Sequence, residues 1–151
     1  MEIITHTKQG LQILNVAEGA TPAAVAEQVD AAGSSVYAEG SDVPLADGLT
    51  LIEQEVADGA HVFVGKHHKI AVTVAHNGAT KNNEFPPSQR VERVFDWACG
   101  KQAFNLTPTD KAEHTLALDE EPVDLRRLVG SYADQHGKVR FDLVPKHRFE
   151  G

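Results

Sequence analysis

Cys99 is the only cysteine of the sequence and the side chain best suited to covalent chemistry. A thiolate can carry an acyl group as a thioester, but the thiol needs a base or a cation nearby to ionise. No histidine or aspartate stands in a recognisable motif relation to Cys99. It lies at the end of an amphipathic segment before Gly100, where a small buried thiol is common. We therefore interpret Cys99 as a core residue rather than a nucleophile.

Histidine and acidic side chains are candidates for metal binding. The adjacent pair His67-His68 points in two directions in most backbones, and no acidic or cysteine partner lies at ligand spacing. The acidic run Asp119–Glu121, followed by Asp124, lacks the spacing and the glycine of a calcium loop. We expect no metal and no cofactor, and interpret these segments as a solvated linker and a solvated turn. The remaining histidines considered are expected at the surface: His61, His136 and His147.

Composition narrows the class of protein further. The chain has 151 residues, 41% of them hydrophobic and 24% charged, which is typical of a globular protein. Its net charge of −8 argues against a nucleic-acid partner. No stretch has the length of a membrane span, the first residues do not form a signal peptide, and one cysteine fits a reducing compartment. Without a phosphate-binding glycine loop or a catalytic motif, we expect a cytoplasmic protein that is not an enzyme.

Charge is divided unevenly along the chain. Residues 1–68 contain two basic side chains, Lys8 and Lys66, and ten acidic ones, whereas residues 69–151 contain twelve of each. An acidic half followed by a neutral half indicates two modules. The segment Gly65–Lys69 between them is short and polar, as in a tight linker. We expect one domain over residues 1–66 and a second over residues 67–151.

The first half reads as a hairpin, one helix and further short strands. Two β-rich runs flank Gln9-Gly10, which is the spacing of a hairpin. Thr21 is a suitable N-cap with Pro22 at the first helical position, and Gly33 follows the helix. The expected elements are strands over Glu2–Lys8, Leu11–Ala17, Ser35–Glu39 and Ala60–Val64, and a helix from Pro22 to Ala32.

The second half repeats this order. Asn77-Gly78 is typical of a tight hairpin turn, and an apolar stripe with helical spacing runs from Val91 to Ala98. The expected elements are strands over Lys69–Ala75, Ala79–Phe85, Thr115–Leu118 and Lys138–Val144, a helix ending at Cys99, and a helical turn over Leu125–Val129. One helix can cover one face of a small mixed sheet. The predicted fold class is therefore α+β, with one main helix on each of two sheets.

This order resembles the β-grasp fold of ubiquitin. The segment Leu45–Val64, which contains Thr50-Leu51 and Asp58-Gly59, is similar to the end of many ubiquitin-like domains. The resemblance covers nearly the whole chain and implies two tandem β-grasp domains. The tandem arrangement resembles the interferon-induced two-domain modifier of vertebrates and, more closely, bacterial two-domain ubiquitin-like proteins of the BilA type.

The resemblance implies a protein modifier that acts through its C-terminal carboxylate on Gly151. An E1-like enzyme would activate this carboxylate with ATP, an E2-like enzyme would carry it as a thioester, and a target amine would accept it. An isopeptidase would reverse the bond. The bacterial relatives further imply a role in antiviral defence.

The resemblance also assigns a role to the end of the chain. We expect Pro145 to break the last strand and residues 145–151 to form a flexible tail for enzyme recognition. The recognised side chains would be Lys146, Arg148, Phe149 and Glu150. Glu150 departs from the family pattern, which usually has glycine before the terminal glycine. An activating enzyme would then need a wider channel and a partner for this carboxylate.

Two questions stay open at the level of sequence. If Val62 and Val64 face the core, Phe63 faces outward beside His61 and would contact a partner or the other domain, whereas another register would bury it.

The alternative to a modifier is a non-covalent adaptor that binds through a sheet face or an open edge. A sulfur carrier is disfavoured because such proteins usually have one domain and end in two glycines.

Overall fold

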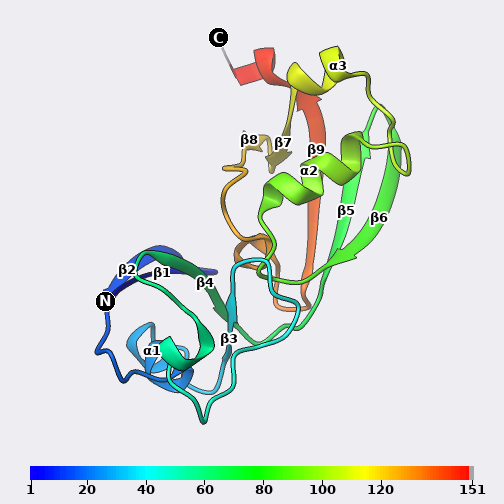
Figure 1. Ribbon diagram of the computed structural model, residues 1–151. Coiled ribbons are helices and arrows are strands. Elements are labelled where there is room, and N and C mark those ends of the chain that lie inside the picture. The colour runs from blue at the N-terminus through cyan, green and yellow to red at the C-terminus, as the bar shows by residue number, and fades with distance from the viewer. Residues whose placement is uncertain (150–151) are drawn as a thin grey trace.

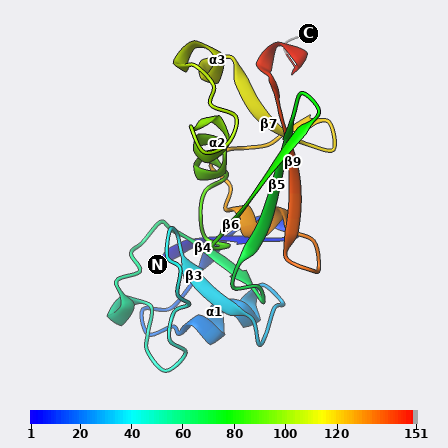
Figure 2. The same ribbon diagram turned by 90° about the vertical axis from the view of Figure 1, so that its right-hand side faces the viewer.

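The computed structural model describes residues 1–149, which form two mixed sheets (Figures 1 and 2). We call residues 1–65 the N-terminal unit and residues 70–149 the C-terminal unit. The two units lie end to end, and the short segment 66–69 joins the last strand of the first to the first strand of the second. Each unit places its main helix against one face of its own sheet. The fold is α+β, as predicted.

The N-terminal unit contains a four-stranded sheet in the order β2-β1-β4-β3. Strand β1 pairs antiparallel with β2 and parallel with β4, and β3 pairs antiparallel with β4. The Thr21 hydroxyl accepts a hydrogen bond from the Ala24 N–H and Pro22 opens α1, as the sequence predicts. The elements are β1 (Glu2–Thr7), β2 (Gly10–Asn15), α1 (Pro22–Gln28), β3 (Ser35–Ala38), η1 (Ile52–Gln54) and β4 (Ala60–Gly65).

The C-terminal unit contains a five-stranded sheet in the order β6-β5-β9-β7-β8. Its first four strands repeat the order and directions of the N-terminal sheet, with β5 parallel to β9. The elements are β5 (Ile70–His76), β6 (Ala79–Phe85), α2 (Val91–Cys99), α3 (Pro108–Ala112), β7 (His114–Leu118), β8 (Glu121–Pro122), η2 (Val129–Tyr132), β9 (Lys138–Pro145) and η3 (Lys146–Phe149).

Each unit has its own hydrophobic core between its sheet and its helix. In the N-terminal unit, Val25 of α1 packs with Ile3, Val62 and Val64 of the sheet. In the C-terminal unit, the apolar stripe of α2 packs on the inward side chains of β5, β7 and β9. The largest fully buried members there are Phe141, Ile70, Leu116 and Leu143.

The first helix is shorter than the sequence predicts. It ends at Gln28 instead of Ala32, because Asp30 takes a left-handed conformation with φ 56°. The Ala31 N–H then bonds the carbonyl of Ala26 in place of the regular helical partner. The helical pattern of apolar residues beyond Gln28 therefore belongs to a turn.

The prediction of a helical turn over Leu125–Val129 is wrong in its position. This segment instead forms a turn, in which the Arg127 N–H donates to the carbonyl of Asp124, and it caps the start of α2: the N–H groups of Val91 and Glu92 donate to the carbonyls of Arg127 and Leu125. The helical turn follows instead as η2. Capping of free N–H groups by another segment is a tertiary effect that local periodicity does not contain.

The end of the chain also differs from the expected free tail. Strand β9 continues to Pro145, which pairs with His114 of β7, and the Lys146 N–H donates to the carbonyl of Glu113 at 2.8 Å. Residues Lys146–Phe149 then form the single turn η3. Pro145 is tolerated because it is the last residue of the strand. In the described part of the chain, no helix is long and apolar enough to cross a bilayer.

A comparison of Leu116 with Leu11 distinguishes the contribution of core packing to stability from that of exposed apolar surface. Leu116 is fully buried in the C-terminal core, whereas Leu11 is 52% exposed on β2. We expect Leu116→Ala to lower the free energy of unfolding by about 2–5 kcal/mol, because it leaves a cavity. Leu11→Ala should stay within about 0.5 kcal/mol. Urea unfolding of both variants is the measurement, and equal effects would contradict the assigned core.

Candidate functional site

The outer face of the C-terminal sheet, opposite α2, carries two polar rows across β6, β5 and β9. Ala71 pairs with Glu84 on one side and Lys138 on the other. Thr73 pairs with Asn82 and Arg140 in the same way, and its hydroxyl donates to the Asn82 side-chain oxygen at 2.7 Å. The central strand thus presents small residues, and the flanking strands present longer ones.

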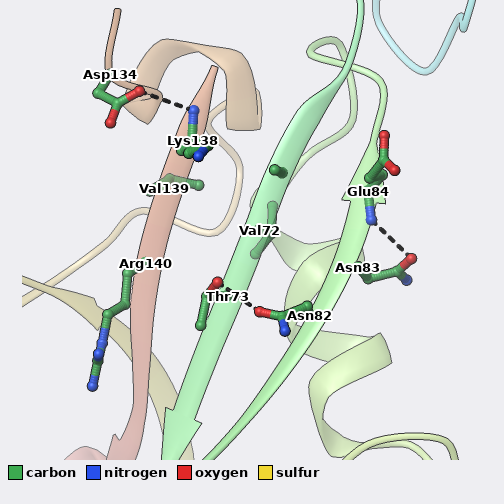
Figure 3. A pocket seen from close by; sticks show the side chains of 10 residues that line it. Val72, Thr73, Asn82, Asn83, Glu84, Asp134, Lys138, Val139 and Arg140 are labelled. Atoms are coloured by element: carbon green, nitrogen blue, oxygen red, sulfur yellow. Dashed lines mark hydrogen bonds between the residues drawn. The ribbon is translucent and has the colours of Figure 1, made fainter. Parts of the chain in front are cut away.

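This alternation produces a shallow groove of about 750 Å³ that follows β5. Figure 3 shows Lys138 and Arg140 on the β9 side, with Asn82, Asn83 and Glu84 on the β6 side. The two walls differ in charge, because the β9 wall carries two cations and the β6 wall one carboxylate and two amides. Such a groove can bind an extended segment through hydrogen bonds and charge pairing.

Asp134 closes one end of the groove without offering a free carboxylate. Its Oδ1 accepts hydrogen bonds from the N–H groups of His136 and Lys138, at 2.8 and 3.0 Å. These bonds hold the pKa of Asp134 below its ordinary value. Asp134 therefore fixes the turn into β9, and Lys138 and Arg140 are left as the charged groups of that wall.

A second groove lies at the other end of the sheet, next to the end of β9. Its volume is about 650 Å³, and Arg148 lines it together with His76, His114 and Asp142. The His76 Nδ1–H donates to the carbonyl of Leu143, which ties the β5–β6 turn to β9. This groove is the surface that immediately surrounds the exit of the chain from the sheet.

The residues predicted for the tail lie at this exit as far as they are described. Lys146 and Arg148 are exposed on η3, and Phe149 is partly exposed. Glu150 and Gly151 lie outside the described residues. Strand β9 runs away from the N-terminal unit, so η3 lies at the opposite end of the molecule (Figures 1 and 2). An enzyme can thus approach this end without meeting the N-terminal unit.

Phe63 lies far from the chain end and is only 3% exposed. Val62 and Val64 face the N-terminal core, and Phe63 faces the other side, where it clusters with Tyr37 and Leu128. Leu128 belongs to the C-terminal unit. Phe63 is therefore a contact between the two units, and the structure does not bring it together with the tail.

Several polar side chains lie near Phe63. Among them are His6, to which the sequence assigns no role, His61, which is expected at the surface and is half-buried instead, and His68 of the expected linker. His6 is 1% exposed, and its Nδ1 accepts a hydrogen bond from the Leu128 N–H at 3.3 Å. His6 Nε2 lies 2.8 Å from His61 Nδ1, and His68 Nδ1 lies 2.5 Å from the Tyr37 hydroxyl. His6 lies on the outer face of β1 beside Phe63 of β4, and no local pattern shows that another unit covers that face.

Cys99 occupies the core of the C-terminal unit at the end of α2. Burial raises the pKa of this thiol to about 11, so it stays protonated at neutral pH. Among residues 1–149, no group of three or more histidine, cysteine or acidic side chains is arranged to bind a metal ion.

Comparison with known proteins identifies the C-terminal unit. The family model described as BilA ubiquitin-like domain 2 matches residues 71–146, which is just over half of the chain. The chain belongs to the BilA family. The match runs from the start of β5 through β9 to the first residue of η3, so the polar groove and the chain exit lie on the BilA ubiquitin-like domain.

The comparisons with curated proteins and solved structures add little to the assignment of this chain to the BilA family. No curated protein matches it. Among solved structures, an NMR structure of an Arabidopsis thaliana protein shares 19% identity, covers 52% of this chain and 87% of that one, and has a TM-score of 0.40.

The side chains of Lys138 and Arg140 are exposed, and the backbone of their strand β9 is paired with β5. We expect Lys138→Ala and Arg140→Ala each to change the free energy of unfolding by no more than about 0.5 kcal/mol. Thermal and urea unfolding would check this. A loss above about 2 kcal/mol in either variant would show that the side chain supports the BilA-family fold itself.

Proposed function

We propose that this chain is a ubiquitin-like protein modifier, joined to target proteins through the carboxylate of Gly151. An E1-like enzyme activates the carboxylate, an E2-like enzyme carries it as a thioester, and an isopeptidase removes the modifier. The pathway proposed is bacterial antiviral defence. The observation that carries the proposal is the BilA ubiquitin-like domain over residues 71–146, whose last strand leads directly to the end of the chain.

The position of the chain exit supports this proposal. Strand β9 is held between β5 and β7, so the segment after Pro145 starts from a rigid base. The exposed cations Lys146 and Arg148 lie at this base and can guide an acidic enzyme surface to the tail. The exposed cations at the start of the tail thus agree with a role as a substrate of activating and conjugating enzymes.

The N-terminal unit is proposed to be a second ubiquitin-like domain. It repeats the strand order and the single covering helix of the C-terminal sheet. It lies on the far side of the molecule from η3, and its residues 1–65 carry ten acidic side chains and one basic side chain, Lys8. Its role in the proposal is to add bulk and a second, acidic surface to the attached modifier.

The alternative is a non-covalent adaptor. The observation that favours it is β6, an edge strand whose first six residues are all exposed and whose outer edge is unpaired in the sheet order. An extended peptide can add to such an edge. The two functions differ in what they require of the last residues, because an adaptor binds without them.

Intact-mass spectrometry of the chain in its native host separates the two functions. We expect adducts whose mass equals chain plus target minus water, and we expect them to disappear when Gly151 is deleted. The control is Gly48→Ala, at a glycine where an added Cβ meets nothing within 4 Å. A chain recovered only at its free mass, with partners unchanged after the deletion, would support the adaptor instead.

The polar groove gives a second test of the modifier function. Arg140→Glu replaces one of the two cations of the β9 wall by an anion without removing any residue of the core. We expect it to slow the formation of the E1-bound species at least tenfold, because charge complementarity chiefly sets association rate. The matched control is Lys101→Glu, an exposed residue outside the groove, for which formation of the same E1-bound species is measured. Equal rates for the two variants would remove the groove from the recognition step.

A further inference from the structure

The contact between the two units, which we call the joint, is built from few residues. His6, Tyr37 and Phe63 supply it from the N-terminal unit, and Leu128 and Gly130 from the turn before and within η2. The ring of Phe63 lies so near Gly130 that a Cβ on this glycine would approach its Cε1 to 2.5 Å. The apolar part of the joint therefore has no spare room.

A second contact lies beside the apolar one. Arg90 at the start of α2 forms an ion pair with Glu39 after β3, with Nε and Oε1 2.9 Å apart. The Gly40 N–H donates to the carbonyl of Ser88 at 3.0 Å, and the Ser88 hydroxyl donates to the carbonyl of Ser41. These bonds hold the two units at one orientation, but all except the Ser88 contacts are partly open to solvent.

The hydrogen bonds of His6 fix its protonation state. Because the Leu128 N–H is a donor, His6 Nδ1 must accept and carries no hydrogen. The hydrogen of the neutral ring then sits on Nε2 and is directed at Nδ1 of His61. A proton added to Nδ1 of His6 would place two donors against each other, so the cationic ring is incompatible with the closed joint.

The charges around His6 act in the same direction. Burial is the largest effect, and His61, Arg127 and Arg90 add repulsion, opposed only by Asp124. Arg127 is held in place over the ring of Tyr132, 5.2 Å from its centroid. Together these groups lower the pKa of His6 to about 4.

We propose that the joint is an acid-sensitive latch: the two units move as one rigid body while His6 is neutral, and they separate when His6 takes up a proton. This inference does not depend on the proposed modifier function. It concerns the relation of the two units, and it uses a histidine that neither core contains.

Linkage fixes the direction and the pH window of the effect. A histidine with an ordinary pKa of 6.5 in the open state and about 4 in the closed state binds its proton more tightly when the joint is open. The preference for the closed joint is complete above pH 6.5 and falls as the pH drops to about 4. The closed-to-open ratio decreases about 300-fold across that window, as the pKa difference requires.

Residual dipolar couplings measured on the whole chain test the latch. At pH 7 we expect a single alignment tensor to fit the amides of both sheets. At pH 3.5 we expect two tensors, with the amide shifts of each sheet still those of a folded unit. A single tensor at pH 3.5 would overturn the proposal, and so would loss of both sheets together with the joint.

His6→Asn provides the matched control. Asparagine offers an oxygen near the position of Nδ1 for the Leu128 N–H, and it does not titrate between pH 7 and 3.5. We expect this variant to keep one alignment tensor at pH 3.5. If it opens at the same pH as the unmodified chain, His6 is not the latch.

Gly130→Ala tests the same linkage from the other side at neutral pH. Its Cβ would meet Phe63 and Pro87, whereas the control Gly48→Ala meets nothing within 4 Å. If opening the joint hydrates His6, the NMR titration of its ring should shift from about 4 toward 6.5 in Gly130→Ala and stay near 4 in Gly48→Ala. An unchanged His6 titration in Gly130→Ala would show that the joint does not control this histidine.

Discussion

The burial of one sheet face by a turn from the other unit is the interaction on which the arrangement of this molecule depends. Phe63, Tyr37 and His6 all belong to the outer face of the N-terminal sheet, and Leu128 and Gly130 close over them. Two small sheets that would otherwise be linked only by residues 66–69 are thereby held in one orientation. Small domains bury little surface by themselves, so a shared contact of this kind also stabilises both.

The repeated strand order makes the two outer faces directly comparable. Taking Thr5 with Val62 as equivalent to Val72 with Val139, the positions of His6, Leu11 and Phe63 correspond to Thr73, Asn82 and Arg140. The first set is apolar or aromatic, and the second is polar. One copy of the pattern therefore turns His6 and Phe63 toward the rest of the chain, with Leu11 52% exposed, and the other leaves its polar face to solvent. The same architecture joins the two units on one sheet and presents a polar surface on the other.

Local signals in the sequence predict most of the strands and both main helices. Alternation along Lys138–Val144, the Asn77-Gly78 turn and the Thr21-Pro22 cap each depend on a few neighbouring residues, and each is found where expected. The short helix α3 escaped notice although Thr107-Pro108 repeats the Thr-Pro signal, with the Thr107 hydroxyl accepting from the Asp110 N–H. A cap signal was present there, but the helix of five residues has no apolar stripe to reveal it.

The early end of α1 has a local cause in Asp30, but the other errors share a different cause, which is that a distant segment decides the local structure. Residues 125–128 form no helix because the carbonyls of Leu125 and Arg127 cap α2, and Lys146 stays near the sheet because Glu113 accepts its N–H. His6 reads as an outward polar residue of β1, and only the position of Leu128, 122 residues later, makes it a buried one. Contacts over such separations are absent from any local pattern. The sequence therefore predicts a candidate site at the chain end, and Phe63 is the only residue of the joint that it singles out.

Gly65 shows how the same limit affects the interpretation of a single residue. In the sequence it stands at the start of a short polar segment and is interpreted as the glycine of a tight linker. In the structure it ends β4 and pairs with Ser35, and a Cβ there would overlap the ring of Phe63. Its backbone is not in the left-handed region, so conformational freedom is not what this position requires. The requirement is space for a ring two residues earlier, and Gly130 meets the same requirement from the other unit. Two glycines far apart in the chain thus make room for one aromatic side chain, and the linker begins only after Gly65.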